Sequence, residues 1–137
     1  MSSRSIAVFF YGLFMDGDAL RAKGFHPTQG RQACVSGMAL RIGRRATLVP
    51  DAAGRVFGFV MDLSHAEVDR LYAEPSVAAY RPEAVMAELT DGSRIAALCF
   101  NLPPSDEPDT ANPDYAEKLR AAAVRLGLPA DYVRGIR

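Results

Sequence analysis

Apolar and polar positions change their pattern sharply at Gly12. Ile6 to Tyr11 is a continuous apolar and aromatic run with the length and composition of a buried strand. Beyond Gly12 the pattern suits a helix: Asp16 and Asp18 are good N-caps for the Ala-Leu-Arg-Ala-Lys stretch that follows, and Gly24 is a suitable stop. The sequence therefore predicts a strand-to-helix turn at Gly12.

Most of the remaining strands follow one another directly. Five further strands are predicted, over residues 34–42, 46–49, 55–62, 80–89 and 93–102. Gly37 interrupts the first of them as a bend or bulge, and Pro50 to Gly54 is predicted to be a turn. The Asp91-Gly92 pair indicates a hairpin between the last two strands. Consecutive strands favour an α+β fold over a doubly wound one.

The helix after residue 63 has the clearest local signals. Ser64 and Glu67 form a capping box at its start, and Pro75 is expected to end it just after Glu74. On a helical wheel, Glu74 falls about 60° from Leu71. The Glu74 carboxyl can therefore lean toward the interior, where a partly desolvated carboxyl could both take and give a proton near neutral pH.

The end of the chain is predicted to be helical. Asn112 and Pro113 open a long helix that Gly127 ends, and residues 128–132 begin a shorter helical piece. Pro103 to Pro113, which holds four prolines and several acidic residues, is predicted to be a surface loop.

The length and composition of the chain limit which classes of protein it can belong to. At 137 residues, the chain is predicted to be one domain, residues 1–137, with a core that needs no disulfide or metal. Sixteen basic and sixteen acidic side chains give no net charge, so no nucleic-acid or membrane partner is expected. The N-terminal apolar run is too short for a signal peptide or a membrane span, which predicts a cytoplasmic protein.

Cysteine and histidine give no sign of a metal or cofactor. Cys34 and Cys99 lie in apolar segments and are expected to be buried, reduced thiols. His26 and His65 are isolated and lack the spacing of metal ligands. We therefore expect no cofactor and no metal.

Three groups are candidates for chemistry. The amides of the Gly12 turn could bind an anion or a polarised carbonyl, with the Tyr11 phenol beside them. The Tyr11-Gly12 dipeptide also suits a plain tight turn. Glu74 could be a general acid and base or a surface glutamate. Arg41, Arg44 and Arg45 could bind a carboxylate or phosphate, or lie on a solvated face.

Several motifs occur in the order of a known family. They are Val-Phe-Phe-Tyr-Gly-Leu-Phe-Met, Gly-Arg-Arg-Ala-Thr-Leu-Val-Pro, Gly-Arg-Val-Phe-Gly, Leu-x-x-Glu-Pro with a later Tyr-Arg, and Tyr-x-x-x-Leu with Gly-Leu-Pro-x-x-Tyr. From Val8 to about Tyr132 the chain resembles the γ-glutamylcyclotransferase-like (AIG2-like) family. The resemblance implies a small α+β fold, a mixed β-barrel of five to six strands with peripheral helices.

The resemblance also implies an activity and a site. Such enzymes cyclise a γ-glutamyl amine or short γ-glutamyl peptide, releasing 5-oxoproline and a free amine, without a cofactor. The loop that grips the γ-glutamyl group corresponds here to Tyr11, Gly12, Leu13, Phe14 and Met15, the catalytic glutamate to Glu74, and a following tyrosine to Tyr80. The partner implied is a small-molecule γ-glutamyl substrate, and the chain is expected to be a monomer or homodimer.

Two positions depart from the family pattern. Leu13 and Phe14 replace small polar residues of the loop, and the run before Glu74 is one residue shorter than usual, with Pro75 in place of glycine. A rival alignment places Tyr72 at the catalytic position. The alternative function is therefore a non-catalytic small-molecule-binding or interaction module on the same fold.

Overall fold

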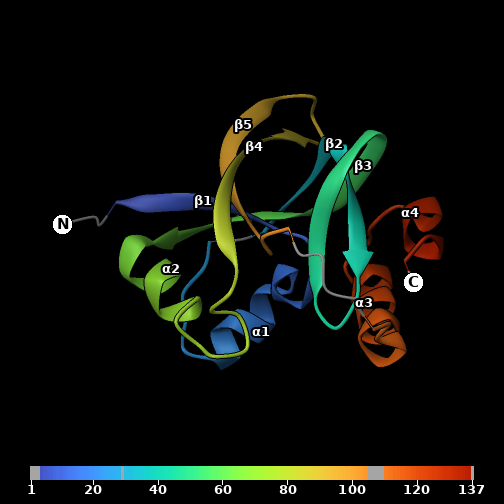
Figure 1. Ribbon diagram of the computed structural model, residues 1–137. Helices are drawn as coiled ribbons and strands as arrows, with labels where there is room; N and C mark the ends of the chain where they lie inside the picture. Colours follow the sequence, from blue (N-terminus) through green and yellow to red (C-terminus); the bar gives the residue numbers. More distant parts are fainter. Residues whose placement is uncertain (1–3, 29, 105–109, 137) are drawn as a thin grey trace.

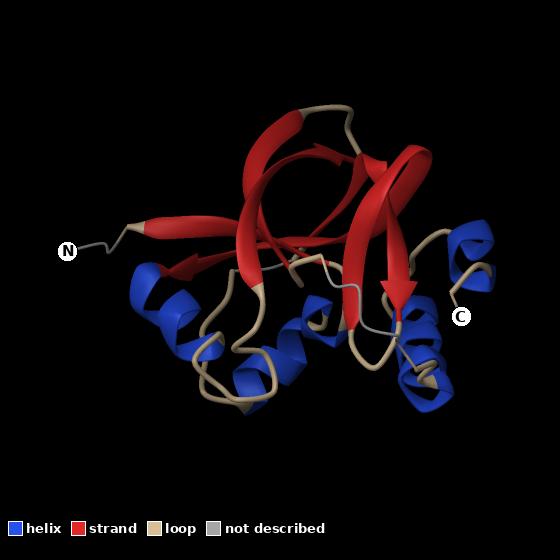
Figure 2. Ribbon diagram, in the orientation of Figure 1, coloured by secondary structure: helices blue, strands red, loops and turns tan. Residues whose placement is uncertain are grey.

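The computed structural model describes residues 4–28, 30–104 and 110–136, which form a curled sheet with helices gathered along one side (Figures 1 and 2). The elements in chain order are β1 (Ser5–Phe10), a 3-10 turn (Leu13–Met15), α1 (Gly17–Ala22), β2 (Arg31–Ile42), β3 (Ala46–Ser64), α2 (His65–Leu71), β4 (Arg81–Leu89), β5 (Arg94–Asn101), α3 (Pro113–Arg125) and α4 (Ala130–Arg134).

The five strands form one sheet in the order β1-β3-β2-β4-β5. Four neighbouring pairs are antiparallel, and β1 meets β5 in parallel through a single register pair, Val8 with Leu98, which closes the ring of strands. The seam between β2 and β4 is also short, with two register pairs. The predicted α+β class and mixed sheet are confirmed, with five strands among the described residues.

β3 is one strand of 19 residues, where the sequence predicted two shorter strands joined by a turn over Pro50 to Gly54. The pairing register with β2 shifts between Ser36 and Met38, so that residues 51–54 lie opposite Gly37. Gly37 has a φ of 85°, which glycine adopts most readily. The bulge predicted at Gly37 is confirmed, but the turn is wrong, because the chain passes through it and stays extended.

α2 begins where predicted and ends earlier. The capping box of Ser64 and Glu67 is present in full. The helix ends at Leu71 because the following residues form a series of turns, in which the Val77 N–H donates to the Glu74 carbonyl at 3.0 Å. The prediction that Glu74 closes the helix and leans inward beside Leu71 is therefore wrong.

The other local predictions agree with the structure. Asp16 caps α1, Asn112 caps α3 through the Tyr115 N–H, and β4 and β5 pair as a hairpin. Cys34 and Cys99 are both buried free thiols. Part of the predicted surface loop, residues 105–109, lies outside the described residues.

The core has two parts that share β1 as a wall. Val8 and Phe10 pack with buried side chains of the helices, whereas Phe9 and Tyr11 pack within the strands. This division follows from strand geometry, because successive side chains point to opposite faces. The end of β1, where both parts meet the Gly12 turn, is therefore where a cavity can form between sheet and helices.

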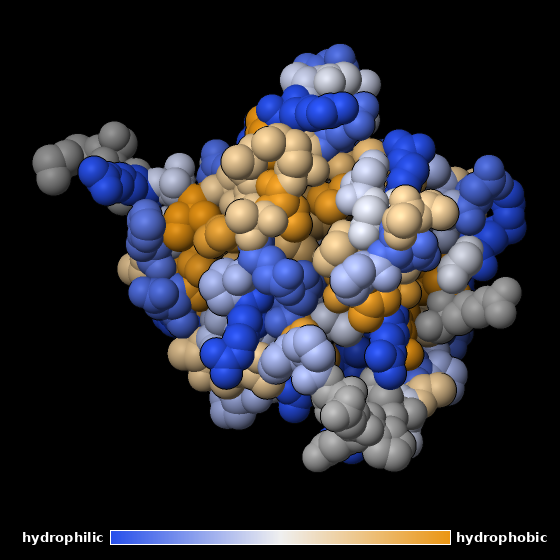
Figure 3. Space-filling view, turned by 45° about the horizontal axis from the view of Figure 1, so that its top comes forward, coloured by the Kyte–Doolittle hydropathy of each residue, from blue (hydrophilic) through white to orange (hydrophobic). Residues whose placement is uncertain are grey.

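The surface mixes hydrophilic and apolar side chains, and apolar ones gather toward the top of the face drawn in Figure 3. Among the described residues, the large hydrophobic side chains that are clearly exposed are Met86 and Val124. No helix within the described ranges is both long enough and apolar enough to cross a membrane.

Candidate functional site

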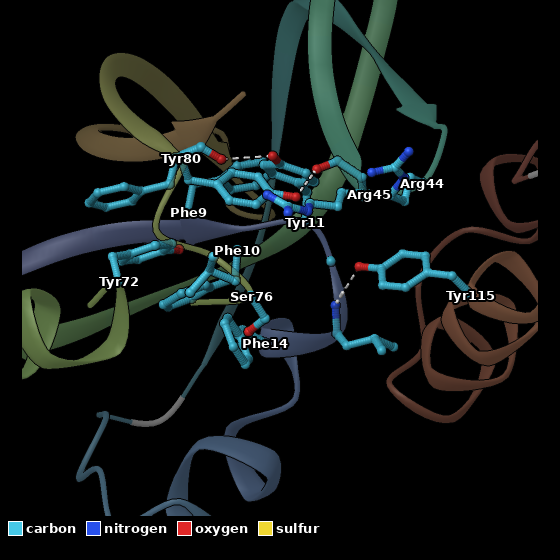
Figure 4. Close-up of a pocket in the computed structure, with 15 residues that line it drawn as sticks. Phe9, Phe10, Tyr11, Phe14, Arg44, Arg45, Tyr72, Ser76, Tyr80 and Tyr115 are labelled. Atoms are coloured by element: carbon cyan, nitrogen blue, oxygen red, sulfur yellow. Dashed lines mark hydrogen bonds between the residues drawn. The ribbon is translucent and has the colours of Figure 1, made fainter. Parts of the chain in front are cut away.

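A pocket of about 270 Å³ opens where β1 runs into the Gly12 turn (Figure 4). Segments far apart in the chain form its wall: β1 and the turn after it, the β2–β3 connection, the turns after α2, β5 and α3. The lining residues are Phe9, Phe10, Tyr11, Gly12, Leu13, Phe14, Arg44, Arg45, Ala46, Tyr72, Ser76, Val77, Tyr80, Phe100 and Tyr115.

Aromatic rings make up most of this wall. Eight of the fifteen lining residues are Phe or Tyr, so the pocket presents mainly apolar ring surface to a ligand. Tyr72 stacks on Phe100 with ring centroids 3.8 Å apart and an angle of 13° between the rings. Phe10 and Phe14 meet edge to face at 6.4 Å. These contacts fix flat surfaces before any ligand binds.

Two phenols anchor the wall to the backbone. The Tyr11 hydroxyl donates to the Phe100 carbonyl at 2.7 Å, which ties the end of β1 to β5. The Tyr80 hydroxyl donates to the Ala46 carbonyl and ties the segment before β4 to the start of β3. Both hydroxyls are used within the protein, and both bonds are drawn in Figure 4.

The Gly12 turn is held by a third phenol. The Leu13 N–H donates to the Tyr115 hydroxyl of α3 at 3.3 Å, and the Met15 N–H donates to the Gly12 carbonyl at 3.0 Å. A Cβ on Gly12 would lie 2.6 Å from the Tyr115 hydroxyl oxygen, so only glycine fits here without movement. The amides predicted to face a substrate are thus partly occupied by contacts within the protein.

Three polar side chains at the pocket remain open to a ligand. The hydroxyls of Tyr72 and Ser76 and the guanidinium of Arg45 have no hydrogen-bond or ion-pair partner within the residues that the structure describes. Figure 4 shows the Tyr72 ring extending from the end of α2 toward Phe10, and Arg45 reaching the pocket from the β2–β3 connection. Arg44 lines the pocket beside Arg45.

The pocket phenols are held neutral. Burial raises the pKa of Tyr72, Tyr11 and Tyr115, in each case as the main cause. Burial, with a further contribution from Tyr115, raises the pKa of Tyr80 to about 12, against the opposing effect of the Arg45 charge. The open Tyr72 hydroxyl can form a hydrogen bond with a ligand, but none of these four phenols takes up a proton near neutral pH.

Glu74 lies outside this pocket. Its carboxylate pairs with the Lys23 ammonium at 3.4 Å, and its side chain is 36 % exposed. The early end of α2 at Leu71 is the reason, because the turns that follow carry Glu74 toward the end of α1 instead of the Gly12 turn. The predicted arrangement, a shielded carboxyl facing the turn amides, is not present.

The other predicted site residues fall into two groups. Tyr11, Gly12, Leu13, Phe14 and Tyr80 line the pocket, as does Tyr72 of the rival alignment. Met15 does not line it, and its side chain is buried in the core on the helix side. Of the three candidate arginines, Arg44 and Arg45 line the pocket, whereas Arg41 is an exposed residue of β2 outside it.

Sequence reasoning missed several lining residues. Phe9 and Phe10 belong to the predicted buried strand and Tyr115 to the predicted long helix, and neither pattern marks them as site residues. Nothing in the local sequence marks Ser76, Val77 or Phe100 as site residues, because they meet the Gly12 turn only through the tertiary fold.

The fold and the pocket together define a class: a small α+β protein with a closed mixed sheet and a ligand-sized pocket at the end of its first strand. Residues 8–118 match the family described as gamma-glutamyl cyclotransferase, AIG2-like, and the chain belongs to this family. No curated protein matches the chain in sequence.

Solved structures resemble the whole fold at low identity. A structure described as a gamma-glutamyl cyclotransferase has a TM-score of 0.81 and 18% identity, covering 98% of this chain and 89% of its own. An uncharacterized protein from Homo sapiens has a TM-score of 0.79 and 19% identity, with coverage of 97% and 88%. YkqA from Bacillus subtilis has a TM-score of 0.77 and 21% identity, with coverage of 96% and 52%. At these identities the likeness shows the fold.

Proposed function

We propose that this chain binds a small organic acid in the pocket at the end of β1 and does not cyclise γ-glutamyl compounds. The observation that carries the proposal is the set of groups at the pocket, which includes two guanidinium groups and, among the described lining residues, no carboxylate. A guanidinium recognises a carboxylate through charge-assisted hydrogen bonds. These groups support binding of an acid, whereas the described lining residues include no carboxylate that could take a proton near neutral pH.

A second candidate is the reaction that the family name describes. A γ-glutamyl amine would cyclise by attack of its α-amino group on the γ-carbonyl, releasing 5-oxoproline and the free amine, with Glu74 moving the proton. Family membership favours this reading. It requires the Glu74 carboxylate to leave Lys23 and to reach the pocket.

Release of 5-oxoproline distinguishes the two candidates. The purified protein is incubated with a panel of γ-glutamyl amines and short γ-glutamyl peptides, and 5-oxoproline is quantified against a sample without protein. We expect no protein-dependent release from the wild type. Release that Glu74→Gln abolishes, and that the matched exposed change Glu117→Gln leaves intact, would establish the enzymatic candidate and reject the proposal.

Binding is measured in parallel by thermal shift with 5-oxoproline and other small acids. A ligand that binds only the folded state raises the melting temperature, by an amount that grows with the ratio of its free concentration to its Kd. We expect stabilisation by acids in the wild type and a smaller effect in Arg45→Gln, with Arg41→Gln, an exposed change on β2 outside the pocket, as control. Equal stabilisation of all three proteins would contradict a carboxylate site at Arg45.

A further inference from the structure

We infer that the pocket selects a planar, apolar acid that carries a carboxylate but no ammonium group, such as an arylalkanoic acid. The inference rests on the proposed function and names the class of ligand for the same pocket. It follows from which polar groups remain available, from the shape of the apolar wall and from the sign of the charge at the pocket.

The polar groups that remain available are few and lie on different segments. The Tyr11 and Tyr80 hydroxyls already donate to backbone carbonyls, and the Tyr115 hydroxyl oxygen accepts the Leu13 N–H. Arg45 is therefore the cation open to an acid, with no carboxylate paired to it within the described ranges. Figure 4 shows it on the side of the pocket away from Tyr72, so a carboxylate at Arg45 directs the rest of the ligand toward the rings.

The remaining wall suits a flat apolar body. The stacked pair of Tyr72 and Phe100 and the edge-to-face pair of Phe10 and Phe14 present ring faces and edges to the cavity. Offset and edge-on ring contacts are favourable beyond the area they bury. At about 270 Å³, the cavity lies near the lower end of the range for ligand sites, roughly 300–1,000 Å³, so a single ring with a short acid arm is a suitable size.

An ammonium group on the same ligand meets no carboxylate among the described lining residues. Among the lining residues that the structure describes there is no carboxylate, and the charged ones are Arg44 and Arg45. Aromatic walls can bind cations over their faces, but here the Arg45 guanidinium repels a positive charge in the same cavity. An α-amino acid would have to desolvate its ammonium group without a negatively charged partner among these residues, which is costly. The site therefore discriminates against α-amino acids, γ-glutamyl compounds included.

Three probes that carry the same ring and differ in their charged groups test this inference. 3-Phenylpropanoate carries a carboxylate, phenethylamine carries an ammonium group, and L-phenylalanine carries both. Calorimetric titration measures the binding of each to the wild type. We expect 3-phenylpropanoate to bind at least tenfold more tightly than L-phenylalanine, and phenethylamine to bind least. Arg45→Gln should weaken 3-phenylpropanoate at least tenfold, whereas Arg41→Gln should leave it unchanged.

The outcomes separate the ligand class from the proposed function. Equal or tighter binding of L-phenylalanine or phenethylamine overturns the inference, as does undiminished binding of 3-phenylpropanoate to an Arg45→Gln protein whose circular dichroism matches the wild type. If 5-oxoproline binds but 3-phenylpropanoate does not, the ligand class is wrong while binding of an organic acid stands. If no acid binds at saturating concentration, both the inference and the proposed function fail.

Discussion

At the scale of single residues, the pocket depends on Gly12 having no side chain. The Tyr115 hydroxyl approaches the Gly12 backbone so closely that a Cβ would lie 2.6 Å from its oxygen. The same hydroxyl accepts the Leu13 N–H, so one contact fixes both the shape of the turn and the position of α3.

We predict that Gly12→Ala destabilises the protein by about 1–3 kcal/mol, the usual cost of overpacking, and weakens ligand binding. Gly12 has a negative φ, so the cost is the steric contact and not backbone strain. Denaturant unfolding measures the effect. Removing the hydroxyl in Gly12→Ala/Tyr115→Phe should recover part of the loss, and a double mutant no more stable than Gly12→Ala would contradict this account.

Asn101 is the buried polar side chain of the described core, at 1% exposure. Its amide donates to the Glu83 carboxylate at 3.1 Å, and its carbonyl oxygen accepts the Leu48 N–H at 3.4 Å. We predict that Asn101→Leu costs about 1–3 kcal/mol, because a buried N–H loses its acceptor. Urea unfolding of the wild type and of Asn101→Leu tests this. A neutral Asn101→Leu would show that water replaces the side chain.

At the scale of elements, contacts at the ends of helices help to fix the fold. Glu67 completes the capping box and also accepts the His26 N–H at 2.7 Å, which ties the loop before β2 to α2. Burial acts to raise the pKa of Glu67, but the N–H donors of Ser64 and His26 outweigh it and lower the pKa.

We predict that Glu67→Ala destabilises the protein by about 1–2 kcal/mol, since a cap and a loop contact are lost together. Because the pKa is lowered in the folded state, the contribution is fully present above the ordinary glutamate pKa and is lost as pH falls below it and through the lowered folded-state pKa. Thermal unfolding at pH 7 and at acid pH measures it, with Glu117→Ala on the exposed face of α3 as control. A difference between wild type and Glu67→Ala that does not shrink at low pH would argue against the carboxylate.

Local sequence signals predicted where helices begin better than where they end. The capping box at Ser64 and the Asn112-Pro113 start are complete within four residues, so the sequence alone indicates them. The end of α2 was misplaced because Pro75 limits a helix without preventing an earlier turn. β3 was divided because Pro, Asp and Gly suit a wide bulge as well as a turn.

The site was only partly predictable for a related reason. Tyr11 and Gly12 are recognisable because they sit at a change of pattern, but Tyr115 meets Leu13 across 102 positions of the chain. The path of the turns after α2 decides which side chain reaches the pocket. In the structure this side chain is Tyr72, whereas Glu74 pairs with Lys23 outside the pocket.

At the scale of the whole molecule, buried neutral acids link stability to alkaline pH. Burial raises the pKa of Cys99 from 9.0 to about 12, and burial likewise raises the pKa of Tyr132 from 10.0 to about 12. The unfolded chain ionises these groups first. The stabilisation that these two groups provide is therefore fully present below about pH 9 and is lost as the pH rises toward about 12.

We predict that the free energy of unfolding falls between pH 8 and pH 11, with a limiting slope of about 1.4 kcal/mol per pH unit for each group that ionises only when unfolded. Urea titrations across this range measure the slope. Cys99→Ala should give a shallower slope than the wild type, whatever its stability at pH 8. An identical slope would show that Cys99 does not contribute.

The central claim is that an organic acid binds among the Gly12 turn, the β2–β3 connection and the turns after α2. The most direct measurement is a nuclear magnetic resonance titration of the isotope-labelled protein with 5-oxoproline and with 3-phenylpropanoate. We predict saturable changes at the backbone amides of residues 12–14, 44–46 and 76–77, and none along the distant hairpin turn at residues 90–93. Changes centred on that hairpin, or none at saturating ligand, would contradict the account.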